Sequence, residues 1–143
     1  MAETEPRRTP TLFGHEHVQR YLATGGAEGQ EWNGVQTLIL TTTGRKSGEP
    51  RPTPLIYGRY GRGYVVVASK GGAPQDPGWH LNLLADDRCR IQVGATILEA
   101  RARVARGDER SQLWDLMAQI WPAYNDYALK TSREIPVVVL DPA

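Results

Sequence analysis

Three basic side chains lie close together in one short, glycine-containing segment of the 143-residue chain. Arg45, Lys46 and Arg51 fall within residues 44–51, where Glu49 is the single acidic residue. Arginine presents a planar fork that matches phosphate or carboxylate oxygens, and lysine adds a mobile point charge. The segment is therefore typical of an anion-binding turn or of an ordinary solvent-exposed charged turn, and composition gives the two interpretations equal weight.

A second candidate segment follows the run YVVVA at residues 64–68, which is rich in β-branched residues. Ser69, Lys70, Gly71 and Gly72 come directly after it. Small residues at the end of a strand let a ligand approach the backbone closely, and Lys70 adds a further positive charge. An ordinary hairpin exit is the alternative, although the two glycines and the two prolines that follow favour a loop of special shape.

Aromatic residues form the third candidate. Trp121, Tyr124 and Tyr127 recur at every third position, where Pro122 interrupts the preceding helical pattern. Rings at this spacing form a core or wall a ligand pocket, and the pattern does not separate these two outcomes. Trp79 lies three residues before Asn82, so the two share one face of a short predicted helix. Trp79 could stack on a flat ring or close the end of the barrel.

Composition excludes several other chemistries. The formal net charge of +1 gives no global field for nucleic acid. Cys89 is the single cysteine and His15, His17 and His80 are the histidines, so we expect no zinc site and a reducing, cytoplasmic compartment. No nucleophile–base–acid pattern suggests hydrolysis. No apolar run approaches the ~20 residues needed to cross a bilayer, and the N-terminus shows no secretory signal.

Periodicity and turn residues predict one domain over residues 12–143 after a flexible arm at 1–11. Helices are expected at 12–24, at 79–85 and from Gly107 to the interruption at Pro122. The first should place Phe13, His17, Tyr21 and Leu22 on one face, and the last should have Asp108 as its N-cap. Strands are expected at 37–43, 53–60, 64–68, 89–93, 97–105 and 135–140. Short connecting turns favour antiparallel pairing, so the expected fold is mainly β, a barrel of about six antiparallel strands with flanking helices.

Three segments together resemble a known family. They are TLILTTTGRKSGEPRPTPL (37–55), VASKGGAPQDPGWHLNL (67–83) and WPAYNDYALKTSREIPVVVL (121–140). They are similar to the deazaflavin (coenzyme F420)-dependent nitroreductases of actinobacteria, also described as the A group of F420H2-dependent oxidoreductases, which includes quinone reductases. The resemblance covers residues 12–142. It implies a split β-barrel like that of FMN-binding proteins, with reduced F420 as the hydride donor.

The resemblance also implies roles for individual residues. Those expected to bind the acidic tail of the coenzyme are Arg45, Lys46, Ser47 and Arg51. Those expected around the deazaflavin and its ribityl chain are Pro54, Ala68, Ser69, Lys70 and Gly71, with Gly78, Trp79 and Asn82 on the covering helix. Those expected to contact the substrate are Ile56, Trp121, Tyr124 and Tyr127. Ile56 and Trp121 both replace a tyrosine of the best-studied nitroreductase type.

The expected reaction is hydride transfer to a quinone, an enone or a nitro compound. Ser69 and Tyr124 are candidate proton donors, and no obligate catalytic acid and no metal are assigned. The alternatives are an FMN- or haem-binding split barrel and a non-catalytic F420 carrier. We expect a small-molecule acceptor, no nucleic acid and no obligatory protein partner. The expected location is cytoplasmic, with peripheral contact at the inner face of the cell membrane.

Overall fold

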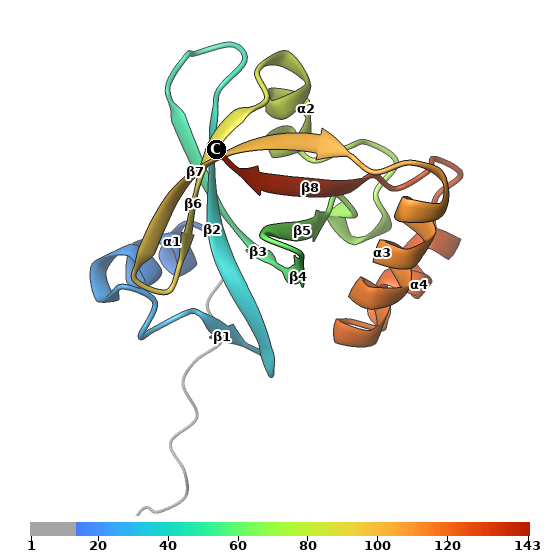
Figure 1. The fold of residues 1–143 in the computed structure, drawn as a ribbon, viewed down its shortest axis with the longest axis horizontal. Helices are drawn as coiled ribbons and strands as arrows, with labels where there is room; N and C mark the ends of the chain where they lie inside the picture. Colours follow the sequence, from blue (N-terminus) through green and yellow to red (C-terminus); the bar gives the residue numbers. More distant parts are fainter. Residues whose placement is uncertain (1–13) are drawn as a thin grey trace, which may run out of the picture.

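A computed structural model describes residues 14–143, which form one strongly curled antiparallel sheet with helices around it (Figure 1). The predicted arm at 1–11 and Phe13 lie outside the described residues. The helices are α1 Gly14–Thr24, η1 Lys70–Gly72, α2 Gly78–Ala85, α3 Gly107–Ile120 and α4 Ala123–Leu129. The strands are β1 Glu31–Trp32, β2 Val35–Thr43, β3 Pro50–Ile56, β4 Gly58–Tyr60, β5 Gly63–Val67, β6 Arg88–Val93, β7 Thr96–Val104 and β8 Val137–Pro142.

The strand order is β1-β2-β6-β7-β8-β5-β4, with β3 paired to β2 off this path. Every pairing is antiparallel, which confirms the expected hairpin architecture. The expected strand count was too low. The single strand expected at 53–60 is two, because β3 pairs with β2 whereas Gly58 pairs with Val65 of β5. Pro52 and Pro54 have no backbone N–H to donate, so they suit a strand such as β3, which pairs with β2 and lies off the main path of the sheet.

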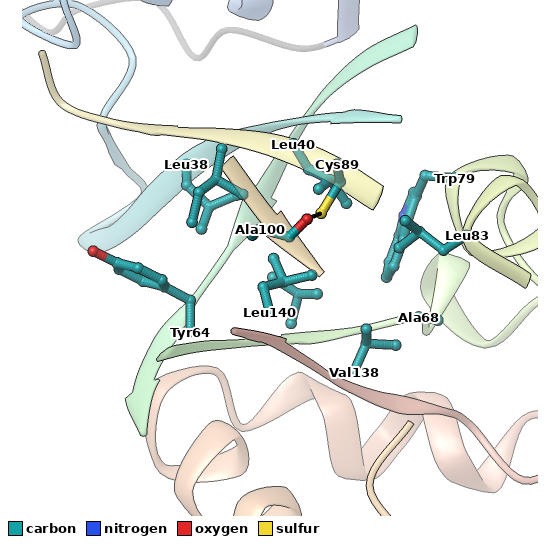
Figure 2. Close-up of a cluster of buried hydrophobic side chains, with 12 residues drawn as sticks. Leu38, Leu40, Tyr64, Ala68, Trp79, Leu83, Cys89, Ala100, Val138 and Leu140 are labelled. Carbon is teal, nitrogen blue, oxygen red and sulfur yellow. Dashed lines mark hydrogen bonds between the residues drawn. The ribbon is translucent and has the colours of Figure 1, made fainter. Parts of the chain in front are cut away.

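The barrel interior is filled by alternate residues of the strands (Figure 2). Leu38 and Leu40 of β2 point inward, as do Val138 and Leu140 of β8. Cys89 is buried among them, with its Sγ 3.6 Å from the carbonyl oxygen of Ala100. Because the side chains of a strand alternate between faces, this inward set leaves a second set of residues for the outer face.

The outer face of β5 and β8 is covered by α3 and α4. Val65 and Val139 pack there against Leu113 and Met117, so these two strands are buried on both sides. Leu116 and Ile120 flank these two residues and complete the apolar face by which α3 packs on the sheet. The expected N-cap is wrong, because Arg106 occupies that position and makes no side-chain cap bond. Asp108 lies in the first turn instead, where its charge is favourable near the positive end of the helix dipole.

Helix α1 packs against the outer face of β2, at the opposite side of the barrel from α3 and α4 (Figure 1). Tyr21 is fully buried, and its hydroxyl donates to the carbonyl oxygen of Thr37 at 3.0 Å. The expected helix face was wrong at Leu22, which is 47% exposed, because Val18 completes the buried face with His17 and Tyr21. Helix α4 is not among the predicted helices; it begins directly after Pro122, which occupies its N-cap.

Candidate active site

Two adjoining cavities lie beside β3 and the β2–β3 turn. One, of about 510 Å³, is lined by the turn and the start of α2. The other, of about 370 Å³, is lined largely by aromatic and aliphatic side chains. Thr53, Lys70, Pro77 and Trp79 line both cavities, so the two form one elongated site. A long ligand with one polar end and one flat end matches this shape.

The β2–β3 turn is a compact hydrogen-bonded unit. Ser47 Oγ accepts hydrogen bonds from Arg51 Nη2 and from the backbone N–H of Glu49, both at 3.1 Å. Gly44 closes the turn, and a Cβ at this position would lie 2.6 Å from Ser47 Oγ and 3.2 Å from Arg51 Nε. A side chain at this position would displace Ser47 Oγ, so glycine preserves the bond between Ser47 and Arg51. The turn holds Arg51 and Ser47 in a fixed relation at the wall of the larger cavity.

Asn82 fastens this turn to α2. Its Oδ1 accepts from the backbone N–H of Arg45 at 3.1 Å and from Arg45 Nη1 at 2.9 Å. Its Nδ2 donates to Thr42 Oγ1 at 3.0 Å, and the side chain is buried. Because the amide is engaged at both ends, Asn82 acts chiefly by orienting Arg45. Figure 1 shows the β2–β3 turn and α2 at the same end of the sheet, as these bonds require.

The charge of the larger cavity is one-sided. Arg45, Lys46, Arg51 and Lys70 are among its described lining residues, and no carboxylate is. Within residues 14–143, none of these four cations forms an ion pair, whereas Arg103 is bound by both Glu109 and Asp141. Unpaired cations that converge on a cavity favour an anionic ligand. This geometry supports an anion site over a merely solvated turn.

The turn after β5 carries Lys70 into the region that both cavities share. Lys70 has a φ of 47°, and Gly71 and Gly72 follow with φ of 64° and 86°. A Cβ on Gly72 would lie 2.8 Å from the carbonyl oxygen of Tyr127, so the turn packs directly on the backbone of α4. The segment that carries the cation is therefore in contact with the segment that carries the aromatic rings.

The smaller cavity has an aromatic wall. Trp121, Tyr124 and Tyr127 line it, together with Ile56 from β3. Tyr124 and Tyr127 meet edge to face with ring centroids 6.0 Å apart. Tyr124 is also part of the core under α3, so this residue serves as core and wall at once. Burial raises the pKa of the Tyr124 hydroxyl, so that it keeps its proton at neutral pH.

Most predicted site residues line one of the two cavities, including Pro54, Ser69, Gly71 and Gly78. The structure does not bring Ala68 to either cavity, because its side chain points into the barrel interior. Sequence reasoning missed Trp32, whose ring lies 5.5 Å from that of Trp121 and extends the aromatic wall. The signal was present, since Asn-Gly after Glu31–Trp32 is typical of a two-residue hairpin that folds this strand onto β2.

Among the described residues, no group of three or more His, Cys, Asp or Glu side chains is placed to hold a metal ion. None of the helices in that part of the chain has the length and apolar character needed to cross a bilayer.

The fold and the site define a class: a small antiparallel split barrel with a cation-lined cavity that runs into an aromatic one. A model of the F420H(2)-dependent quinone reductase family matches residues 13–142. The chain therefore belongs to this family. Membership confirms the resemblance and the expectation of an oxidoreductase that uses reduced coenzyme F420.

Individual relatives agree with this assignment. An F420H(2)-dependent quinone reductase from Mycobacterium tuberculosis is 39% identical over 128 residues, which cover 87% of this chain and 86% of that protein. A solved structure described as an F420-H2 dependent reductase is 39% identical with a TM-score of 0.69, covering 73% of this chain and 93% of that one. A haem storage protein from Vibrio cholerae is 13% identical with a TM-score of 0.58 over 92% of each chain, which shows the shared split-barrel fold alone.

Proposed function

We propose that this protein binds reduced F420 along the two adjoining cavities and transfers its hydride to a quinone held against the aromatic wall. Enones and nitro compounds are further acceptors of the same flat, electron-poor kind. The observation that carries the proposal is the continuity of the two cavities. A cation-lined space and an aromatic space share Lys70 and Trp79, so one molecule with an acidic tail and a flat ring can occupy both.

The residues present fit the coenzyme. Arg45, Lys46 and Arg51 would bind the phosphate and oligoglutamate tail, since arginine forks match these oxygens and no carboxylate is among the described residues that line this cavity. Lys70 would lie between the tail and the ring. When bound, reduced F420 supplies a hydride from its deazaflavin ring, and the chain supplies orientation and surroundings.

The aromatic wall would orient the acceptor. Hydride transfer needs reacting atoms about 3–3.5 Å apart, which a flat acceptor stacked in a confined cavity satisfies. Trp121 and Tyr127 offer ring surface, and the indole N–H of Trp121 donates to the Tyr127 hydroxyl at 3.4 Å. Ile56 contributes an aliphatic surface to the same cavity.

A quinone that accepts a hydride becomes a hydroquinone anion and then takes a proton. Tyr124 lines the cavity and its hydroxyl keeps its proton, so it would donate a hydrogen bond to the developing oxyanion. Ser69 also lines this cavity, and its hydroxyl is the second candidate donor. Water from the open side of the site can return the proton to whichever group donates it.

A titration followed by an acceptor screen tests this function. Purified protein is titrated with F420 and then supplied with reduced F420 and a naphthoquinone, a cyclic enone or a nitroaromatic. We expect saturable binding and steady oxidation of the coenzyme with the quinone. Binding without turnover on any acceptor would identify a carrier, and absence of binding would refute the proposal. A cytoplasmic location and peripheral contact with the inner face of the membrane stay predictions.

A further inference from the structure

One arginine outside both cavities holds the turn that follows β5. Arg133, between α4 and β8, is 16% exposed at its side chain. Its Nε donates to the carbonyl oxygen of Ala73 at 2.9 Å, and its Nη2 donates to those of Ala68 and Ser69 at 3.2 and 2.9 Å. Its Nη1 pairs with Asp76 Oδ1 at 2.7 Å. A single guanidinium thus bridges both ends of the turn.

The turn that Arg133 bridges is conformationally unfavourable. Lys70 has a side chain yet adopts a left-handed backbone, which is unfavourable for a residue other than glycine. Such conformations persist when the surrounding structure over-determines them. Within the turn itself, Gly72 N–H donates to the Ser69 carbonyl and Ala73 N–H donates to that of Lys70. Arg133 adds the bonds that tie this small unit to the end of β5 and to Asp76.

The consequence of the turn's shape is the placement of Lys70. Lys70 is the one cation that lines both cavities among their described residues, and Ser69 lines the aromatic one. Arg133 itself lines neither of them. A loss of the Arg133 bonds would let Lys70 relax toward ordinary backbone angles and move its ammonium group away from the shared region.

We propose that Arg133 is a positioning residue for the coenzyme: its guanidinium fixes the Ser69–Ala73 turn so that Lys70 faces the junction of the two cavities and Ser69 faces the aromatic one. The proposal rests on the proposed function, because F420 is the ligand whose binding it explains. Arginine is needed at this site because its planar fork donates in several fixed directions at once. Lysine keeps the charge but cannot reach three carbonyl groups and a carboxylate from one position.

Arg133→Lys is the test variant, and Arg110→Lys is its matched control. Arg110 is also partly buried, donates to the carbonyl of Ile135 at 2.7 Å and lies 3.7 Å from Glu134, but it bonds to no residue of the turn. We expect Arg133→Lys to weaken F420 binding about tenfold or more, on the scale by which small misplacements of binding groups lower activity. The KM for the quinone should change much less. Arg110→Lys should keep the wild-type affinity for F420.

Hydrogen exchange on the coenzyme-free protein gives a second readout. The amide of Gly72 should exchange faster in Arg133→Lys than in the wild type or in Arg110→Lys. If Arg133→Lys does not fold, Asp76→Asn is measured instead. A weaker affinity of Asp76→Asn than of the wild type for F420 supports the proposal. Wild-type affinity in Arg133→Lys, or in Asp76→Asn where that variant decides, overturns it. A wild-type protein that fails to bind F420 refutes the proposed function itself, which is a separate outcome.

Discussion

Reversing the charge of Arg51 is the sharpest test of the cation-lined cavity. Arg51 is exposed and donates to Ser47 Oγ, and the cavity wall it belongs to has no carboxylate among its described residues. An exposed ion pair contributes up to about 1 kcal/mol. Arg51→Glu exchanges an attraction for a repulsion of similar size. The change should therefore weaken the binding of F420 by about 2 kcal/mol, or about 30-fold in Kd.

The assay is a fluorescence titration with F420 at low and at high salt. Arg62→Glu is the control, because Arg62 is exposed, lines neither cavity and gives the same change in formal net charge, from +1 to −1. The loss in Arg51→Glu should shrink at 1 M salt, where the Debye length is about 3 Å. A deazaflavin without phosphate and glutamates should bind both variants equally. Wild-type affinity for F420 in Arg51→Glu at low salt, or an equal loss in Arg62→Glu, would refute the reasoning.

Three further predictions concern the wall, the turn and the pH dependence of stability. Tyr124→Phe should lower kcat with a quinone by about 100-fold while the Kd for F420 is unchanged, because it removes only the donating hydroxyl; an unchanged kcat would move that role to Ser69 or water. Gly72→Ala should lower the free energy of unfolding by about 2 kcal/mol, measured by urea denaturation, since its Cβ would meet the Tyr127 carbonyl at positive φ. Burial lowers the pKa of His80 from its usual 6.5, against the opposing effect of Asp76 and with a smaller contribution from Arg133. The unfolded chain therefore binds more protons below pH 6.5, and stability that is present above that pH is lost as the pH falls. The melting temperature of His80→Gln should decline less steeply than that of the wild type between pH 6.5 and 5, and parallel slopes would contradict this.

Much of the fold was readable because its determinants are local. Consecutive valines in β5 and β8 mark strands, and both prove to be buried on two faces. The number of strands was missed for a different reason. Whether residues 53–60 form one strand or two depends on which neighbours pair with β3 and β4, and that is a property of the whole sheet. β1 was missed although Asn33-Gly34, with φ of 49° and 83°, is a strong hairpin signal.

The residues of the candidate site likewise divide into those that the sequence could identify and those that it could not. The basic turn is contiguous in sequence, so its residues could be named in advance, and the resemblance supplied their ligand. The bonds from Asn82 to Arg45, and from Arg133 to Ser69, join residues that are 37 and 64 positions apart. No pattern within one segment encodes such pairs. The sequence therefore identified the groups that face the ligand better than the groups that hold them in place.

The pocket-versus-core ambiguity of the aromatic segment has a physical origin. Tyr124 is buried against α3 and also lines the cavity, so both interpretations of its spacing are true. Trp121 and Ile56 are only partly buried, and each packs at the margin of that same core. Substitutions at these two positions reshape the cavity without opening the core. The two differences from the best-studied nitroreductase type can thus alter the acceptor side while the cation-lined half, built from a separate turn, stays intact.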